Sequence, residues 1–378
     1  MLSLYSFSKA FMVTQVPLFS SKDANLGVDL VGAMQRVVER NWYVLGTEVA
    51  AFEAEFATYQ GVRSCISLAN GTDALEIALR TLCIGPGKRV ALVANAGFYG
   101  STAVHTVGAE PVYVDVDTVT LTMAPAALQA ALASSVDAVI VTHLYGQMAD
   151  IEKIAAMVAA SKVPLIEDCA QSHGASRNGR RAGSFGDIAC YSFYPTKNLG
   201  AIGDGGAITT NSADLDTRAR RLRQYGWSRK YHISEAGGRN SRLDEIQAAV
   251  LREKLPMLDG WNAQRRDIAA RYNAAFAGLP MQLPISAGDD FVVHLYVIRV
   301  HDRTAFISSM AAAGIATDIH YPVPDHRQTA YPQLSETSLP VTEAACGMVV
   351  TLPCFPGLDA DSVERVIAAV RGHFGVGN

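Results

Sequence analysis

The sequence PLIEDCAQSHGA, residues 164–175, begins with a short apolar run and turns polar at Glu167 and Asp168. An apolar run of this length predicts a buried β-strand over 164–167. Similar short runs occur earlier in the chain, at 65–68, 89–93, 111–114 and 138–142. Stretches with helical spacing of apolar residues lie between them. This alternation predicts an α/β fold with a mainly parallel central sheet flanked by helices.

Polar residues follow two of these strands at the point where each ends. Asn70-Gly71-Thr72 follows the strand at 65–68, and Asp168 follows the strand at 164–167. Ligands of parallel sheets bind beyond the carboxyl ends of the strands. A helix starting here would direct free backbone N–H groups and the Thr72 hydroxyl towards an anion such as a phosphate. Capping of that helix by Thr72 or Asp73 is the simpler alternative.

A second stretch, YSFYPTKNLGAIGDGGAI at 191–208, contains a single lysine, Lys197. A lysine amine forms an imine with an aldehyde cofactor, and a carboxylate beside the ring nitrogen of that cofactor keeps the nitrogen protonated. Taken singly, Lys197 is more simply a solvated side chain and Asp168 a helix cap. Together, in a parallel α/β chain, they indicate a pyridoxal phosphate enzyme. Ser192 offers a further hydroxyl to the cofactor phosphate.

Composition and charge exclude several classes of function. The formal net charge is −4, so no overall basic field favours nucleic acid or an anionic membrane. No apolar run reaches the roughly 18 residues that a membrane span needs, and no basic region precedes the apolar N-terminal residues as in a signal peptide. The six cysteines lack the spacing of zinc ligands. We therefore expect a cytoplasmic protein that binds no metal.

The chain is long enough for two domains. We expect an N-terminal extension over 1–15, a large cofactor-binding domain over 16–254 and a small C-terminal α+β domain over 255–378. The boundary is set by Pro256, which should break or kink the helix that begins near residue 242.

Four motifs stand in the order and spacing of the DegT/DnrJ/EryC1/StrS family of sugar aminotransferases. They are NGTDAL at 70–75, EDCAQ at 167–171, SFYPTKN at 192–198 and GRNSRLD at 238–244. The chain resembles this family from about Val16 to its C-terminus. The resemblance implies the fold of type I pyridoxal phosphate enzymes and transfer of an amino group from L-glutamate to a nucleotide-linked keto sugar. It also implies a homodimer with shared active sites.

The resemblance also implies roles for individual residues. Lys197 would carry the cofactor, Asp168 would contact the ring nitrogen, and Gln171 would lie near the ring hydroxyl. The phosphate contacts would be Gly71, Thr72, Ser192 and, reaching into the site of the partner subunit, Asn240.

The aromatic side chain that stacks on the cofactor ring should fall within ANAGFYG at 94–100. This segment departs from the Thr-aromatic-Ile-Ala-Thr pattern of many relatives. We expect Phe98 in this role, with Tyr99 as the second choice. Packing in the protein core is the alternative for either residue.

Two further segments bear on the substrate. RQYGWSRKY at 223–231 and HYPVPDHRQTAY at 320–331 look most like members that act on dTDP-3-keto-6-deoxyhexoses. We therefore expect amination at C3, with amination of a 4-keto sugar as the alternative. Another pyridoxal phosphate reaction or a non-catalytic regulatory paralogue is less expected. Candidate substrate-binding residues are His320, Tyr321, His326 and Arg239.

Overall fold

The computed structural model describes residues 15–285 and 288–376. The expected N-terminal extension over 1–15 therefore lies outside the described residues, apart from Gln15. The smaller elements of the chain are the helices α1 (Ser21–Ala24) and α2 (Leu30–Arg40), the strand pairs β6 (Ser176–Arg177) with β7 (Arg180–Arg181) and β10 (Trp227–Arg229) with β11 (His232–Ile233), and the 3₁₀ turns Leu144–Gly146, Leu255–Met257, Asp325–Arg327 and Pro332–Leu334.

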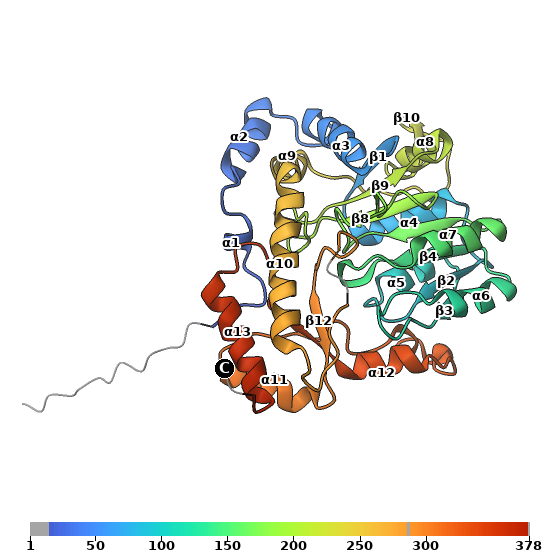
Figure 1. The fold of residues 1–378 in the computed structure, drawn as a ribbon. Helices are drawn as coiled ribbons and strands as arrows, with labels where there is room; N and C mark the ends of the chain where they lie inside the picture. The colour runs from blue at the N-terminus through green and yellow to red at the C-terminus, as the bar shows by residue number, and fades with distance from the viewer. Residues whose placement is uncertain (1–14, 286–287, 377–378) are drawn as a thin grey trace, which may run out of the picture.

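A seven-stranded sheet lies at the centre, in the order β1–β9–β8–β5–β4–β2–β3 (Figure 1). Its strands are β1 (Ser64–Leu68), β2 (Arg89–Val93), β3 (Glu110–Val114), β4 (Ala138–Thr142), β5 (Leu165–Asp168), β8 (Ile188–Ser192) and β9 (Gly206–Thr210). The pairs β2–β3, β2–β4, β4–β5 and β5–β8 are parallel, whereas β9 runs antiparallel to both of its neighbours. The predicted mainly parallel α/β fold is confirmed.

Helices cover both faces of the sheet, which is why most side chains of its strands are apolar and buried. In β2, Val90 and Leu92 pack on one face while Ala91 and Val93 pack on the other. The first face is covered by α4 (Gly71–Thr81), α5 (Tyr99–Thr106) and α8 (Ala213–Leu222). The second is covered by α3 (Thr47–Gln60), α6 (Pro125–Ala133), α7 (Ile151–Ala160) and α9 (Glu245–Lys254).

The C-terminal part has a hydrophobic cluster of its own. The antiparallel pair β12 (Tyr296–Arg299) and β13 (Val349–Leu352) packs with α10 (Leu258–Phe276), α11 (Arg303–Ala312) and α13 (Ala360–His373). α12 (Pro340–Met348) lies before β13. In Figure 1, α11 and α13 (orange to red) group at the lower left, away from the sheet. This arrangement supports a separate C-terminal unit, and the boundary near 255 remains a prediction.

Two details of the structure differ from a simple division of the chain into domains over 16–254 and 255–378. Pro256 lies in a 3₁₀ turn that joins α9 directly to α10, so the chain bends there without leaving helical conformation. Val16 forms a parallel bridge with Ile315 and is buried in the C-terminal cluster, so the chain crosses that unit before it reaches the sheet.

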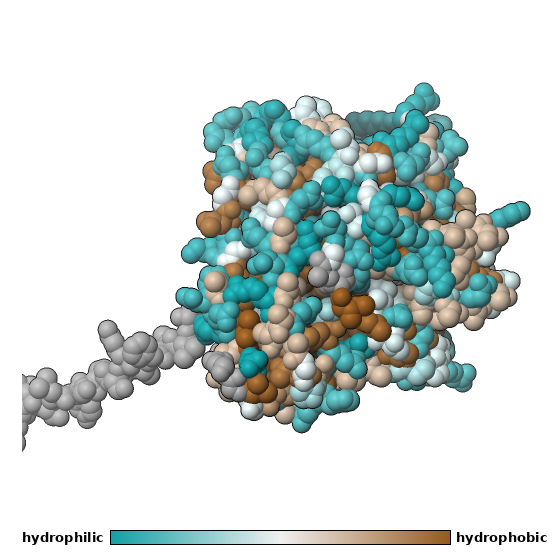
Figure 2. Space-filling model, in the orientation of Figure 1, coloured by the Kyte–Doolittle hydropathy of each residue, from teal (hydrophilic) through white to brown (hydrophobic). Residues whose placement is uncertain are grey.

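No described helix is both long and apolar enough to span a membrane. On the face shown in Figure 2, hydrophilic side chains cover most of the upper half, and hydrophobic ones gather lower down, over the C-terminal elements.

Candidate active site

A cavity of about 970 Å³ opens at the carboxyl ends of the parallel strands. That volume suits a ligand well above the size of a single amino acid. Eight residues predicted from the sequence line it together: Gly71, Thr72, Asp168, Gln171, Ser192, Lys197, His320 and Tyr321. The chain therefore brings both expected catalytic side chains and three of the four expected phosphate contacts, Gly71, Thr72 and Ser192, to one space.

One end of the cavity is formed by the start of α4. Asn70 caps this helix, because its Oδ1 accepts a hydrogen bond from the Asp73 N–H at 2.8 Å. The cap is thus neither of the two residues considered from the sequence. A Cβ atom on Gly71 would lie 2.7 Å from the Ser192 Cβ, so only glycine lets these two segments approach so closely. The hydroxyls of Thr72 and Ser192 and the first N–H groups of α4 form a cradle suited to a phosphate.

Asp168 is the last residue of β5 and is held in place by two hydrogen bonds. Its Oδ2 accepts from the Thr142 hydroxyl at 3.2 Å, and its Oδ1 accepts from the Ala170 N–H at 3.1 Å. Burial raises the pKa of this carboxyl, although these donors and the nearby Lys197 oppose the rise. A buried carboxylate of this kind gains from a cationic partner that enters the cavity.

Lys197 lies in the turn that follows β8, where its backbone N–H donates to the Tyr194 carbonyl at 2.8 Å. The side chain borders the cavity and is half-buried, and this burial lowers its pKa to about 8 while the charge of Asp168 raises it. A usable fraction of the amine is therefore unprotonated near neutral pH, as a nucleophile or general base requires.

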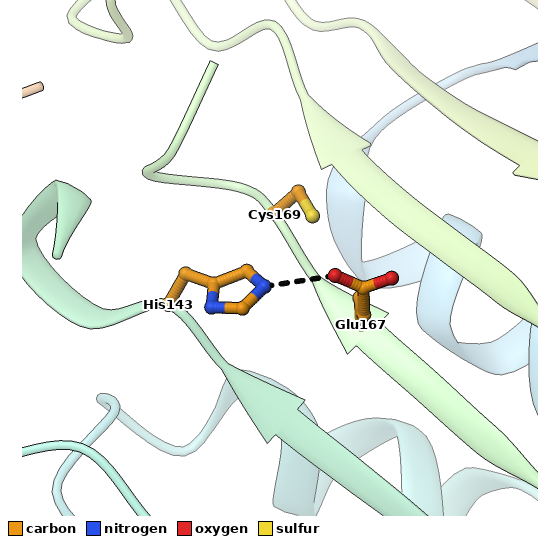
Figure 3. Close-up of side chains that lie close together, drawn as sticks. All are labelled: His143, Glu167 and Cys169. Carbon is orange, nitrogen blue, oxygen red and sulfur yellow. Dashed lines mark hydrogen bonds and ion pairs between the residues drawn. The ribbon is translucent and has the colours of Figure 1, made fainter. Parts of the chain in front are cut away.

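A buried group behind the end of β5 contains His143, Glu167 and Cys169 (Figure 3). His143 Nδ1 accepts from the Ala149 N–H at 3.1 Å, so Nε2 carries the proton and donates to Glu167 at 3.0 Å. Glu167 also accepts three backbone N–H groups from the 183–186 turn. Among the described residues this is the one group with metal-ligand spacing, but its lone pairs are already committed to hydrogen bonds. It ties the ends of β4 and β5 together and so supports the carboxylate at the end of β5.

The sequence profile of the DegT/DnrJ/EryC1/StrS aminotransferase family matches residues 25–371. The chain belongs to this family. It is therefore a pyridoxal 5'-phosphate-dependent aminotransferase.

Known relatives resemble it along nearly the whole length. It is 44% identical to the dTDP-3-amino-3,6-dideoxy-alpha-D-galactopyranose transaminase of Aneurinibacillus thermoaerophilus, over 94% of this chain and 99% of the relative. It is 40% identical to the UDP-N-acetyl-3-dehydro-alpha-D-glucosamine 3-aminotransferase of Acidithiobacillus ferrooxidans, over 92% and 94%. The crystal structure of S. venezuelae DesV aligns with a TM-score of 0.91 and 41% identity, over 95% of this chain and 98% of that one.

The structure reverses the order of the two aromatic candidates in this aminotransferase. Tyr99 lines the cavity and meets Tyr321 edge to face, with ring centroids 6.1 Å apart. Phe98 adopts a left-handed backbone conformation, and its ring packs near His105 and Tyr331 instead. Tyr99 therefore replaces Phe98 as our candidate for stacking on the cofactor.

The turn that carries Tyr99 is tethered by Asp325, a residue that the sequence did not single out. Asp325 Oδ1 accepts from the Phe98 N–H at 3.0 Å, and its Oδ2 accepts from the Ser101 hydroxyl at 2.6 Å. Its own N–H donates to the Ala94 carbonyl at 2.8 Å. Burial raises the pKa of Asp325 to about 7. The Pro-rich loop thus helps to place the aromatic side chain.

Gln171 connects the two sides of the cavity. Its Oε1 accepts from the Tyr145 N–H at 2.6 Å, and its Nε2 donates to the Tyr321 hydroxyl at 3.1 Å. The amide is thereby oriented, and it lies on the same wall as Asp168.

Besides Phe98, three further predicted residues do not line the cavity. His326 is buried, and its Nε2 pairs with Glu343 at 2.9 Å. Arg239 forms ion pairs with the acidic side chains at the start of α4. Asn240 is exposed to solvent. His326 and Arg239 therefore support the fold in this protomer, and a role for Asn240 requires a second copy of the chain.

Proposed function

We propose that this aminotransferase moves an amino group from L-glutamate to C3 of a dTDP-linked 3-keto-6-deoxyhexose and so forms a 3-amino-3,6-dideoxy sugar. The names of the A. thermoaerophilus and A. ferrooxidans relatives support amination at C3. The nucleotide differs between those two relatives, so dTDP is the finer part of the proposal.

The observation that carries the reaction type is the meeting of Lys197, Asp168 and the phosphate cradle on one cavity. The donor set fits pyridoxal phosphate at three points. Hydroxyls and free N–H groups suit its phosphate, the buried Asp168 suits its protonated ring nitrogen, and the uncommitted amine of Lys197 suits its aldehyde.

Bound pyridoxal phosphate supplies an aldehyde that links covalently to amino groups and a ring that accepts electron density. Asp168 holds the proton on the ring nitrogen, since a buried carboxylate stabilises an adjacent cation. With the cofactor in place, the amine of Lys197 would take the α proton of the amino donor and later give a proton back. The same amine serves both substrates in turn, so we expect ping-pong kinetics.

The keto sugar would enter from the side of the cavity that His320 and Tyr321 line. His320 Nδ1 is hydrogen-bonded to the Thr351 hydroxyl at 2.8 Å, and its backbone carbonyl accepts from the Tyr145 hydroxyl. Both side chains are therefore held in fixed positions, which favours recognition of one sugar pose. A misplacement of about 1 Å can cost on the order of 100-fold in rate.

We further propose a homodimer in which Asn240 contacts the phosphate in the partner subunit's site. Exposed apolar side chains such as Trp42, Tyr231 and Ile233 support a contact with a second copy. Mixing Lys197→Ala and Asn240→Ala subunits should give more activity than either parent, because one site of the mixed dimer is intact. A monomer in sedimentation at assay concentration would contradict the dimer.

A cytoplasmic location is also part of the proposal. All six cysteines are free thiols, as expected in a reducing compartment.

The reverse reaction tests the substrate. Purified enzyme is incubated with 3-amino and with 4-amino dideoxy sugars linked to dTDP, and the absorbance of the bound cofactor is followed. We expect conversion to the amino form of the cofactor with the 3-amino sugars alone. Conversion with only the 4-amino sugars would refute the C3 assignment and leave the aminotransferase intact. UDP-linked sugars in a parallel series test the nucleotide.

A further inference from the structure

The cavity has few permanent positive charges. Among the described residues that line it, Lys197 is the only lysine and Arg265 is the only arginine. Three carboxylates, those of Asp168, Asp204 and Asp318, line it as well. The net charge of the cavity therefore disfavours an amino donor with two carboxylates, unless one of the two cations pairs with a carboxylate of that donor.

Arg265 lies on α10, and its side chain has no acidic partner among the described residues. Its Nη1 donates to the backbone carbonyls of Val293, His294 and Cys354, at 3.2, 3.2 and 2.6 Å. Its Nε is buried and has no hydrogen-bond partner in the described part of the chain. Backbone carbonyls orient the guanidinium but leave its charge uncompensated, and such a buried charge is costly unless a counter-ion arrives.

We propose that Arg265 is the binding site for one carboxylate of the amino donor, an acidic α-amino acid. This inference rests on the proposed function. A guanidinium pairs with a carboxylate through charge-assisted hydrogen bonds that suit its planar shape. Arg265 lines the cavity and is only 2% exposed, so its small accessible surface suits a carboxylate better than a bulky nucleotide diphosphate.

The neighbouring histidines sharpen this assignment. His294 and His320 line the same cavity, and burial and the charge of Lys197 lower the pKa of both, so they are neutral near pH 7. Burial also lowers the pKa of Arg265, to about 10, which leaves it charged. Arg265 is thus the permanent cation left for a carboxylate once Lys197 is engaged with the cofactor.

The network around Arg265 links it to the catalytic lysine. His294 Nδ1 is hydrogen-bonded at 3.1 Å to Asn198 Oδ1, and Asn198 directly follows Lys197. Asn198 also donates to Asn262, which lies on α10 as Arg265 does. The guanidinium and the amine are therefore held by one set of buried contacts, so a carboxylate on Arg265 would have a defined position relative to Lys197.

A consequence is that the two half-reactions should depend on Arg265 unequally. The amino donor has carboxylates, whereas the proposed keto sugar has none. Loss of the guanidinium should weaken the binding of the amino donor and leave the binding of the sugar unchanged.

The test compares Arg265→Gln and Arg265→Lys with the control Arg266→Gln. Arg266 is the next residue on α10, pairs with Asp289 at 3.3 Å and does not line this cavity. The two half-reactions are followed separately by cofactor absorbance, one with L-glutamate and one with the amino sugar. We expect Arg265→Gln to raise the apparent Kd for L-glutamate by at least about 10-fold, as for loss of a charged hydrogen bond. Arg265→Lys should restore part of the affinity for L-glutamate, and Arg266→Gln should bind L-glutamate as the wild type does.

A second measurement needs no variant and covers the case in which Arg265→Gln fails to fold. The wild-type enzyme is offered L-glutamate and its two monoamides, L-glutamine and L-isoglutamine. We expect one monoamide to lose affinity by a similar factor, because only one carboxylate meets Arg265.

Three results would overturn the inference. They are an unchanged Kd for L-glutamate in Arg265→Gln, equal losses in both half-reactions, and equal affinity for L-glutamate and both monoamides. Each of these leaves the proposed function standing as long as the wild type reacts with L-glutamate and the amino sugar. No reaction of the wild type with L-glutamate would overturn both.

Discussion

The cavity has two walls of different origin. We define the sheet wall as Gly71, Thr72, Asp168, Ser192 and Lys197, which all follow or end strands of the central sheet or begin the helix after one. We define the C-terminal wall as Arg265, His294, His320 and Tyr321, which come from a helix and two loops of the C-terminal part. We assign the groups of the sheet wall to the cofactor and the groups of the C-terminal wall to the substrates.

The two walls differ in how their geometry arises. Parallel strands bring their carboxyl ends to one edge, so the sheet wall follows from the order of strands. The C-terminal wall exists only because the hydrophobic cluster around β12 and β13 packs its segments beside the sheet. Substitutions in the sheet wall should therefore lower the rate of both half-reactions. Substitutions in the C-terminal wall should affect the binding of one substrate only, or the position of one segment of the chain.

The largest effect should come from Lys197→Ala. Removing the nucleophile and general base should lower turnover by at least about 10⁴-fold in both half-reactions. Borohydride reduction of the wild type should attach the cofactor to Lys197, as peptide mapping would show. Lys254 is a useful comparison, because burial lowers its pKa to about 8 as well, but its Nζ donates to the Gly200 carbonyl and lies outside the cavity. A label on Lys254 would contradict the assignment.

Asp168→Asn should have the next largest effect. The amide cannot keep the ring nitrogen protonated, so we expect cofactor to remain bound while turnover falls by about 100-fold or more. The matched control is Asp204→Asn, which alters another carboxylate that borders the cavity. If the control loses as much turnover as Asp168→Asn, the effect is one of general cavity charge.

The pH dependence of covalent cofactor binding should show the electrostatic coupling between Lys197 and Asp168 in the sheet wall. The pKa of Lys197 is lowered to about 8, so the unprotonated amine grows about 10-fold per pH unit up to that point. The rate at which apoenzyme binds pyridoxal phosphate covalently should rise with pH and level off above about 8. In Asp168→Asn the midpoint should move to lower pH, because the carboxylate raises the pKa of the amine. A midpoint that does not move would show that the two groups are not coupled.

The smallest effect concerns Asp325, which tethers the Tyr99 turn. Its pKa is raised to about 7 in the fold, against about 3.9 in the unfolded chain. Between these values the folded state keeps a proton that the unfolded state releases, so this contribution to stability is lost as pH rises from about 4 to 7. Relative to Asp325→Asn, the wild type should lose on the order of 2 kcal/mol between pH 5 and 8.

Denaturant unfolding of both proteins across this pH range measures the difference. Ser101→Ala serves as control, since it removes a hydrogen bond that lowers the pKa of Asp325 and should keep the pH dependence. A constant difference between wild type and Asp325→Asn would contradict the raised pKa of Asp325.

The sequence predicted local features better than it predicted packing. The strands at 89–93 and 138–142 were predicted with the bounds that the structure has. Helix α6 was not expected, because its run of alanine and leucine has no clear polar face. Phe98 was preferred over Tyr99 because sequence order does not show that Phe98 takes a left-handed conformation.

By itself the sequence determined the succession of strands along the chain, the residues at their ends and hence the half of the site that we assign to the cofactor. Those features depend on alternation of apolar and polar residues and on motifs within a few positions of each strand end. Only the tertiary structure decided that Arg265 lines the cavity, that Asp325 tethers the segment beside Tyr99, and that His326 and Arg239 lie outside the cavity. The physical reason is that side chains from distant segments meet through packing of the C-terminal cluster, and no local pattern records which buried polar group will be left without an acidic partner.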